Sequence, residues 1–274
     1  MAERLRQRSA KPCTAVRIRS RPQSPFERKG FFLIPMYLNT ETTTTLALLL
    51  LIGFGSFYLY WFFSVSEKID LLYQKKSVGD QWYVNRVFHS KLFGALSMGV
   101  LPFLVLEGLN IYPFSEIEMG LTIKSNKLPF AISCVIGYSL LWVPFAYFQS
   151  KSPNHQKHFP QIRTKHWDTI IFTKAISGWV IYLVGYELLF RSLLLFPFVS
   201  ILGPALGIAL NTSLYSAAHL PKGIGETIGS IIVGLFFGYV AIETEMILPV
   251  IIMHWVMSIS NLILTLKHHP EIRL

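Results

Sequence analysis

Long apolar runs separated by short polar segments dominate this sequence. Several of them reach the roughly 20 residues that an α-helix needs to cross a bilayer core about 30 Å thick. Because lipid offers no hydrogen-bond partners to the backbone, runs of this kind are expected to be helices. The clearest are Thr43 to Phe63, Leu92 to Tyr112, Leu128 to Phe148, Asp168 to Leu220, Ile228 to Ile242 and Ile247 to Leu266. The fourth run is long enough for more than one crossing, so the pattern predicts an all-α polytopic membrane bundle of seven or eight transmembrane helices.

The composition agrees with a membrane protein and excludes other classes. Hydrophobic residues make up 52% of the 274 residues and charged residues only 15%, which is unlike an ordinary soluble domain. The two cysteines, Cys13 in a basic segment and Cys134 within a predicted helix, offer no plausible pair. No disulfide framework is therefore expected.

The N-terminal segment, residues 1–35, differs in composition from the rest of the chain. It is rich in Arg, Ser and Pro and lacks apolar periodicity, so it is predicted to be a disordered extension. It also holds most of the formal net charge of +10. A basic tail beside a membrane span favours contact with the anionic lipid bilayer, and no nucleic-acid partner is expected. Residues 36–274 are predicted to form a single transmembrane domain.

The distribution of Lys and Arg between the predicted helices indicates a topology. The connections 65–91 and 149–168 are richer in these residues than 113–127, which places the first two in the cytoplasm and the N-terminus outside. An arginine-rich tail contradicts this orientation, whereas a start at Met36 would remove the conflict. Residues 1–35 are therefore interpreted as either a misannotated start or a real extension, for which an organellar transit peptide is one alternative. The expected location is the plasma (inner) membrane, as a multi-pass protein.

Ionisable residues inside the predicted helices point most directly to function, because each costs on the order of 3 kcal/mol or more at bilayer depth. Glu187 and Arg191 lie within the otherwise apolar stretch Trp179 to Phe198. Their spacing of four residues places them on one helical face, within reach of an ion pair. The alternative to a functional role is a structural ion pair that holds two helices together.

Two histidines lie in other predicted helices. His219 ends an apolar run, with Tyr215 one turn earlier on the same face; such a histidine can also be an interface residue or a helix cap. His254 is followed by Ser258 and Asn261 on one helical stripe. The stripe predicts a buried polar face, for which hydrogen bonding between helices is the simpler role.

Together these residues could perform hydrolysis. A carboxylate, two imidazoles and an amide on separate helices are the groups needed to activate a water molecule and to stabilise an oxyanion. No HExxH metal motif is present. A divalent metal held by Glu187, His219 and His254 is chemically feasible, but the spacing does not demand it, so no cofactor is predicted.

Three segments, in order along the chain, carry a family resemblance. They are Tyr186-Glu-Leu-Leu-Phe-Arg-Ser192, Ser213-Leu-Tyr-Ser-Ala-Ala-His-Leu-Pro221, and His254-Trp with Asn261. They resemble the EExxxR, FxxxH and HxxxN motifs that the CAAX protease and bacteriocin-processing family of intramembrane proteases carries on three successive helices of an eight-helix bundle. Type II CAAX prenyl endopeptidases are of this kind. The resemblance covers about residues 165–266.

The resemblance implies roles for these residues. Glu187 and His219 would activate water, His254 and Asn261 would stabilise the oxyanion, and no nucleophilic side chain would be needed. The supporting positions would be Arg191, Tyr186, Tyr215 and Ser258.

The chain departs from the family pattern at three positions. Tyr186 replaces the first Glu of the first motif, Ser192 stands where Gly usually follows the Arg, and Ser258 stands where the family has its Asn. The first departure matters most, because neighbouring residues on a helix point about 100° apart. Glu187 could therefore pair with Arg191 and leave the site without a base.

Two functions from different classes fit this sequence. The leading hypothesis is an intramembrane endopeptidase that uses a Glu/His-activated water, with a peptide or membrane protein as substrate, such as a prenylated C-terminal peptide or a leader peptide. The alternative is a non-catalytic membrane protein of the same fold, with an immunity or scaffolding role. A transporter is disfavoured because the sequence shows no inverted repeat.

Overall fold

A computed structural model of the chain describes residues 40–76, 79–109, 119–157 and 159–273. Cys13 and the predicted extension at residues 1–35 lie outside these described residues. Within them the regular elements are all helices, and one isolated β-bridge joins His166 to Arg273. The predicted all-α polytopic bundle is therefore confirmed for this part of the chain.

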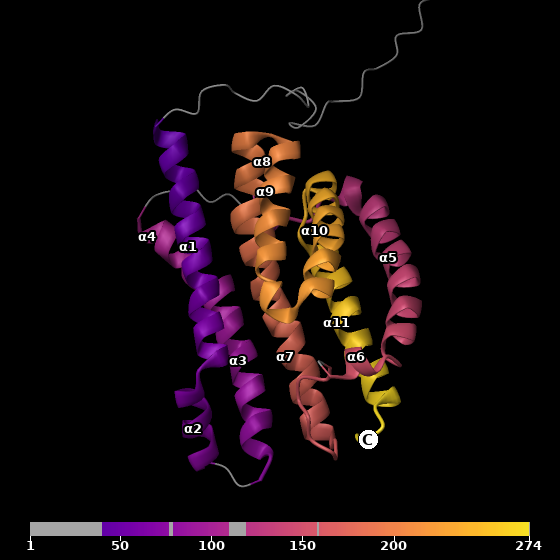
Figure 1. Cartoon of the computed structure of the whole chain (residues 1–274). Coiled ribbons are helices and arrows are strands. Elements are labelled where there is room, and N and C mark those ends of the chain that lie inside the picture. The colour runs from indigo at the N-terminus through magenta and orange to yellow at the C-terminus, as the bar shows by residue number, and fades with distance from the viewer. Residues whose placement is uncertain (1–39, 77–78, 110–118, 158, 274) are drawn as a thin grey trace, which may run out of the picture. The chain divides into compact units, whose positions relative to one another are not determined.

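The described helices follow one another from the N-terminal to the C-terminal end (Figure 1). They are α1 (Thr40–Val65), α2 (Glu67–Lys76), α3 (Gln81–Gly99), α4 (Leu101–Gly108), α5 (Leu128–Gln149), α6 (Pro153–Gln156), α7 (Thr169–Glu187), α8 (Phe196–Leu202), α9 (Pro204–Ala217), α10 (Ile224–Thr244) and α11 (Leu248–His268). Two short 3-10 turns are η1 (Ser125–Lys127) and η3 (Leu220–Lys222). A π-helical segment, η2 (Leu188–Leu195), joins α7 to α8, so that the three form one continuous rod.

Six helical segments of the described chain are long and apolar enough to cross a membrane. They are Thr43–Val65, Gln81–Gly108, Ser125–Gln149, Thr169–Leu202, Ile224–Thr244 and Leu248–His268. The predicted count of seven or eight is therefore not confirmed. The difference arises because α7, η2 and α8 together make one span of 34 residues. α9, with 14 residues, is about 21 Å long at 1.5 Å per residue, which is shorter than the bilayer core.

α3 begins well before the apolar run that the sequence pattern predicts, because its polar residues find partners inside the bundle. Arg86 is buried and donates from Nε to Oδ1 of Asp70 over 2.7 Å. The ammonium group of Lys91, also buried, lies 3.1 Å from the ring centre of Trp179. The prediction that Arg86 and Lys91 belong to a polar connection is therefore wrong.

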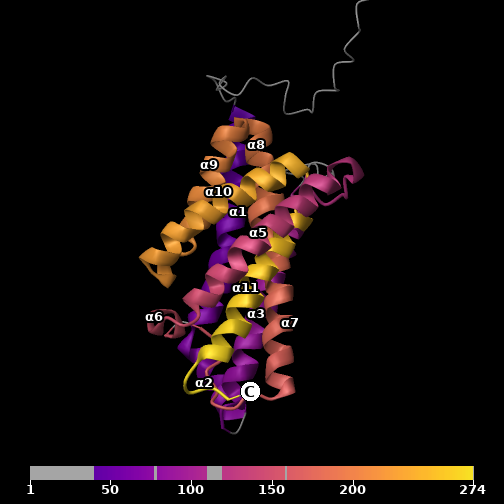
Figure 2. The ribbon, with the colours of Figure 1, turned by 90° about the vertical axis from the view of Figure 1, so that its right-hand side faces the viewer.

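The rod formed by α7, η2 and α8 runs through the middle of the described bundle (Figure 1). α3 packs along α7, and α1 packs against α3. α11 also contacts α7, and α5 packs against α11. Figure 2 shows α5 and α11 running side by side. α8 and α9 form a hairpin that turns at Gly203, whose φ of 82° is a conformation that glycine adopts without strain. α10 packs against α9 and leads into α11.

A close contact between α3 and α7 sets the depth of the residues at the end of α7. A Cβ atom at Gly185 would lie 2.6 Å from Cα of Ala95, and one at Gly99 would lie 2.7 Å from Cα of Gly185. Glycine therefore lets the two helix backbones approach more closely than side chains would allow. Tyr186 and Glu187 come directly after this contact and are positioned by it.

Candidate functional site

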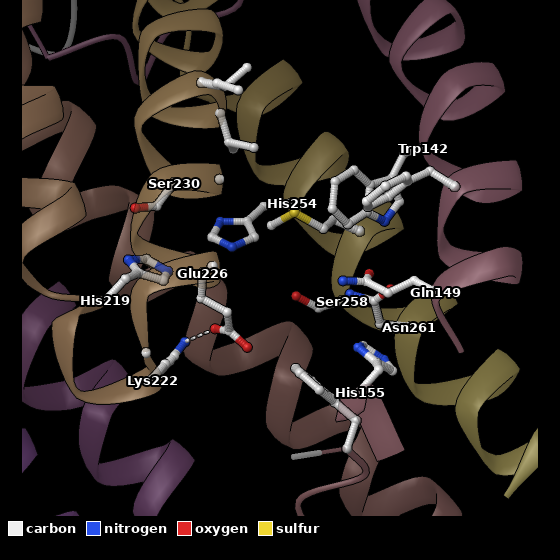
Figure 3. Close-up of a pocket in the computed structure, with 18 of the residues that line it drawn as sticks. Trp142, Gln149, His155, His219, Lys222, Glu226, Ser230, His254, Ser258 and Asn261 are labelled. Atoms are coloured by element: carbon white, nitrogen blue, oxygen red, sulfur yellow. Dashed lines mark ion pairs between the residues drawn. The ribbon is translucent and has the colours of Figure 1, made fainter. Parts of the chain in front are cut away.

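A cavity of about 660 Å³ lies among α5, α7, α9, α10 and α11 (Figure 3). Its wall combines apolar side chains with polar ones from several helices. Of the residues predicted from the sequence, those that line it are Tyr186, Tyr215, His219, His254, Ser258 and Asn261. Glu187 and Arg191 do not line it.

Glu187 lies behind the cavity wall and is fully buried at the end of α7. Its Oε1 is 2.5 Å from Nδ1 of His254, and its Oε2 is 3.2 Å from Nε of Arg191. The predicted ion pair between Glu187 and Arg191 is therefore confirmed. In the described part of the chain, no hydrogen bond or ion pair joins Glu187 to His219. The carboxylate is engaged by His254 instead.

Arg191 ties this pair to the neighbouring helices. It is fully buried in η2, and its Nη1 donates to Oδ1 of Asn211 in α9 over 2.5 Å. Nδ2 of Asn211 donates in turn to the backbone oxygen of Phe190 over 2.6 Å. The guanidinium carbon lies 4.9 Å from the ring centre of Tyr215. π-Helical turns occur often at functional sites, and here one carries the charge that neutralises Glu187.

Tyr186, rather than Glu187, forms the cavity wall at the end of α7. Its ring centre is 5.7 Å from that of His254 and 6.4 Å from that of His219. The Tyr186 hydroxyl is buried and has no hydrogen-bond partner among the described residues. Because helical neighbours point about 100° apart, a chain that turns Tyr186 to the cavity turns Glu187 away from it. At the position where the resemblance calls for the first Glu, the cavity thus meets a phenol.

His219 follows α9 and is held by the backbone. Its Nδ1 is 2.9 Å from the backbone oxygen of Tyr215, and the ring centres of the two residues are 4.8 Å apart. A carbonyl oxygen only accepts hydrogen bonds, so Nδ1 is the donor. In the neutral imidazole, Nε2 then carries the lone pair and can accept a hydrogen bond or a proton.

His254 is fixed in the same way by a different acceptor. The carboxylate of Glu187 accepts from Nδ1, which again leaves Nε2 for a partner in the cavity. The rings of Tyr186 and Phe237 pack edge-on against the imidazole, each with its centre 5.7 Å away. Two imidazoles, one directly after α9 and one in α11, therefore have the same nitrogen left for the cavity.

Ser258 and Asn261 share the buried face of α11 with His254, so the polar stripe predicted from the sequence is confirmed. They lie toward Gln149 and His155 in the cavity (Figure 3). Oδ1 of Asn261 and Oε1 of Gln149 are buried and have no hydrogen-bond partner among the described residues. Unpaired buried acceptors favour a ligand that brings N–H groups, as a peptide backbone does.

The sequence interpretation missed Glu226 and Lys222, which also line the cavity. Glu226 is in the first turn of α10, and its Oε2 lies 3.9 Å from Nζ of Lys222. A signal was present in the sequence: Glu226 is an ionisable residue at the start of an apolar run, shortly after His219.

The described residues contain no group of three or more His, Cys, Asp or Glu side chains placed to hold a metal ion. The arrangement of Glu187, His219 and His254 therefore does not support the metal site considered from the sequence.

The helices that carry these residues can be compared with known protein families. Residues 168–260 match the family model described as Rce1-like, type II CAAX prenyl endopeptidase Rce1-like. The resemblance seen in the sequence is thereby confirmed for this Rce1-like region, which holds Tyr186, Glu187, His219 and His254. It ends just before Asn261. No curated protein and no solved structure matches the chain.

The Rce1-like match and the six candidate spans agree with each other. Together they indicate an integral membrane protein with an Rce1-like region.

Proposed function

We propose that the protein is an intramembrane endopeptidase that hydrolyses a peptide bond in the cavity described above. The observation that carries this proposal is the pairing of His219 and His254 around one cavity, each with Nδ1 bonded to a protein acceptor. Imidazoles with Nδ1 fixed as a donor are suited to proton transfer through Nε2, and to oxyanion binding when Nε2 carries a proton. The Rce1-like match supports the same reaction class.

In this proposal, His254 and Glu187 act as a pair. The carboxylate holds the imidazole in one orientation and balances its charge when Nε2 is protonated, as the buried carboxylate of a serine-protease triad does. Protonated His254 donates from Nε2 to the oxyanion that forms when water adds to the scissile carbonyl. Glu187 thus acts through His254, which differs from the role in water activation that the family resemblance implies for it.

His219 would hold the attacking water, because its Nε2 accepts a hydrogen bond while its Nδ1 is anchored to the backbone. Tyr215 would support His219 by ring packing. Asn261 and Ser258 would contact the substrate peptide. The substrate class is a peptide or membrane-protein segment that enters from the bilayer of the plasma membrane, such as a prenylated C-terminal peptide or a leader peptide.

A cleavage assay tests this proposal. The protein is reconstituted into liposomes with a fluorogenic peptide that carries a farnesylated cysteine near its C-terminus, alongside leader-type peptides. The wild type is expected to release product, and His254→Ala to lower kcat by ~10²-fold or more. His166→Asn is the matched control, since His166 is exposed and does not line the cavity. Equal rates for wild type and His254→Ala, or no product from the wild type, would contradict the proposal.

A non-catalytic protein of the same fold is the second candidate. The observation that favours it is the phenol of Tyr186 in the cavity wall while Glu187 is enclosed. Such a protein would bind a peptide in the cavity without cleaving it. Saturable binding of the farnesylated peptide to the wild type, with no product after prolonged incubation, would support this reading.

A further inference from the structure

Hydrolysis without a nucleophilic side chain needs a group that takes a proton from water. Glu187 does not line the cavity, because its carboxylate is enclosed between Arg191 and His254. Tyr186 turns a neutral phenol toward the cavity instead. Among the described residues that line the cavity, the one carboxylate is that of Glu226.

The fold brings Glu226 back to His219. After His219 the chain makes the short turn η3, passes Gly223 with a φ of 102°, and starts α10 at Ile224. Glu226 is therefore in the first turn of α10, and Figure 3 shows its side chain extending into the cavity in the region of His219 and His254. The side chain is 36% exposed, so water in the cavity can reach its carboxylate.

Two features place positive charge near this carboxylate. The positive end of the α10 dipole favours a negative charge in the first turn. The ammonium of Lys222 lies 3.9 Å from Oε2, and the carboxylate stays partly exposed beside it. A solvated surface pair would be the simpler role for Glu226 and Lys222, but both line the same cavity as the two imidazoles. The unpartnered, buried Oδ1 of Asn261 and Oε1 of Gln149 in that cavity independently indicate that a polar ligand belongs there.

We propose that Glu226, in α10, is the general base of the hydrolytic reaction. It takes the role of the first Glu of the family motif, whose position in α7 is occupied here by Tyr186. This inference rests on the proposed function. A water molecule held by Nε2 of His219 gives a proton to Glu226 as its oxygen bonds to the scissile carbonyl carbon. The carbonyl oxygen becomes an oxyanion that accepts from His254. When the C–N bond breaks, the proton on Glu226 passes to the leaving amine, so that peptide and water yield an acid and an amine with the enzyme unchanged.

The test uses the full-length protein in liposomes and the farnesylated fluorogenic peptide. Glu226→Gln is expected to lower kcat by ~10²-fold or more with little change in KM. Glu243→Gln is the matched control, because Glu243 is on the same helix, is exposed and does not line the cavity; its rate is expected to equal that of the wild type. Adding Tyr186→Glu to Glu226→Gln is expected to restore part of the lost rate, since it places a carboxylate in the cavity wall at the end of α7.

A chemical rescue provides a readout that a structural role would not produce. Glu226→Ala leaves space for a small carboxylate, so millimolar formate is expected to raise its rate at least severalfold and to leave Glu226→Gln unchanged. If Glu226→Gln cleaves as fast as the wild type while His254→Ala is inactive, the assignment of Glu226 is overturned and the proposed function stands. If the wild type is inactive, or His254→Ala is as active as the wild type, the proposed function itself fails.

Discussion

Oε1 of Glu187 lies 2.5 Å from Nδ1 of His254, so a carboxylate at the end of α7 and an imidazole in α11 form one buried pair. The pair orients Nε2 of His254 toward the cavity and keeps Glu187 out of it. His254 lines the cavity and Glu187 does not. In the proposed reaction Glu187 therefore orients the imidazole, while other groups exchange protons with the substrate.

Glu187→Gln is expected to lower kcat by ~10²- to 10⁴-fold, because an amide can donate to Nδ1 and so allows the other tautomer, and because it carries no counter-charge for protonated His254. KM should change little, since Glu187 does not line the cavity. The measurement is steady-state cleavage of the farnesylated peptide by reconstituted protein. Wild-type kcat in this variant would show that the pair plays no part in the reaction.

Arg191→Met is expected to lower the free energy of unfolding by about 3–5 kcal/mol, because it leaves the buried carboxylate of Glu187 without the guanidinium that neutralises its charge. The double variant Glu187→Gln with Arg191→Met should be less destabilised than Arg191→Met alone, since no unpaired charge is then buried. Equilibrium unfolding in mixed micelles measures both. A double variant at least as destabilised as Arg191→Met would contradict this account.

His219→Gln should lower kcat by ~10²-fold or more, because the imidazole that is proposed to hold the attacking water is lost. The thermal unfolding temperature should change little, since the hydrogen bond from Nδ1 to Tyr215 is a single contact at the end of α9. Retention of the wild-type rate would remove His219 from the reaction. His166→Asn serves again as the control.

Tyr186→Phe should leave kcat within a small factor of the wild type, because the hydroxyl makes no hydrogen bond within the described residues and the ring packing against His254 is kept. The measurement is the same cleavage assay together with the unfolding temperature. A loss as large as that expected for His219→Gln would instead assign the phenol a direct role, such as donation to the oxyanion.

Gly185→Ala is expected to destabilise the bundle by about 1–3 kcal/mol, as overpacking does, because its Cβ would lie 2.6 Å from Cα of Ala95. Gly137→Ala in α5 is the control: a Cβ there meets nothing within 4 Å, and Ala favours helix over Gly. Chemical unfolding of both variants in micelles checks this. Equal stability of Gly185→Ala and wild type would show that α3 and α7 can separate freely.

The sequence predicted those features that depend on local periodicity. Spacing along one helical rod is enough to place side chains on one face. This applies to the stripe of His254, Ser258 and Asn261, and to the ion pair of Glu187 with Arg191. The partner of Glu187 could not be predicted in this way, because His254 is far along the chain and the contact depends on how α7 and α11 pack. The start of α3 was missed because the partners of Arg86 that permit its burial are tertiary.

The choice between Tyr186 and Glu187 as the cavity residue was likewise beyond local reasoning. It depends on how far α7 is rotated about its axis, which the Gly185 contact fixes on one side and the anchored Arg191 fixes on the other. The role of Glu226 was missed for a related reason, since only the turn at η3 and Gly223 shows that the start of α10 returns to the cavity.

The π-helical segment η2 also has a consequence for how this site could change by mutation. A π turn holds one residue more than an α turn, so deleting one residue between Leu188 and Phe190 would let the rod become an uninterrupted α-helix. Because the π turn absorbs its extra residue within the turn, such a deletion would leave the faces of α7 and of Arg191 in nearly the same relation. A deletion of one residue inside the regular helix α7 would instead change the phase by about 100°. The loss of a single codon is therefore compatible with this site within η2, whereas the same loss within α7 turns another side chain toward the substrate.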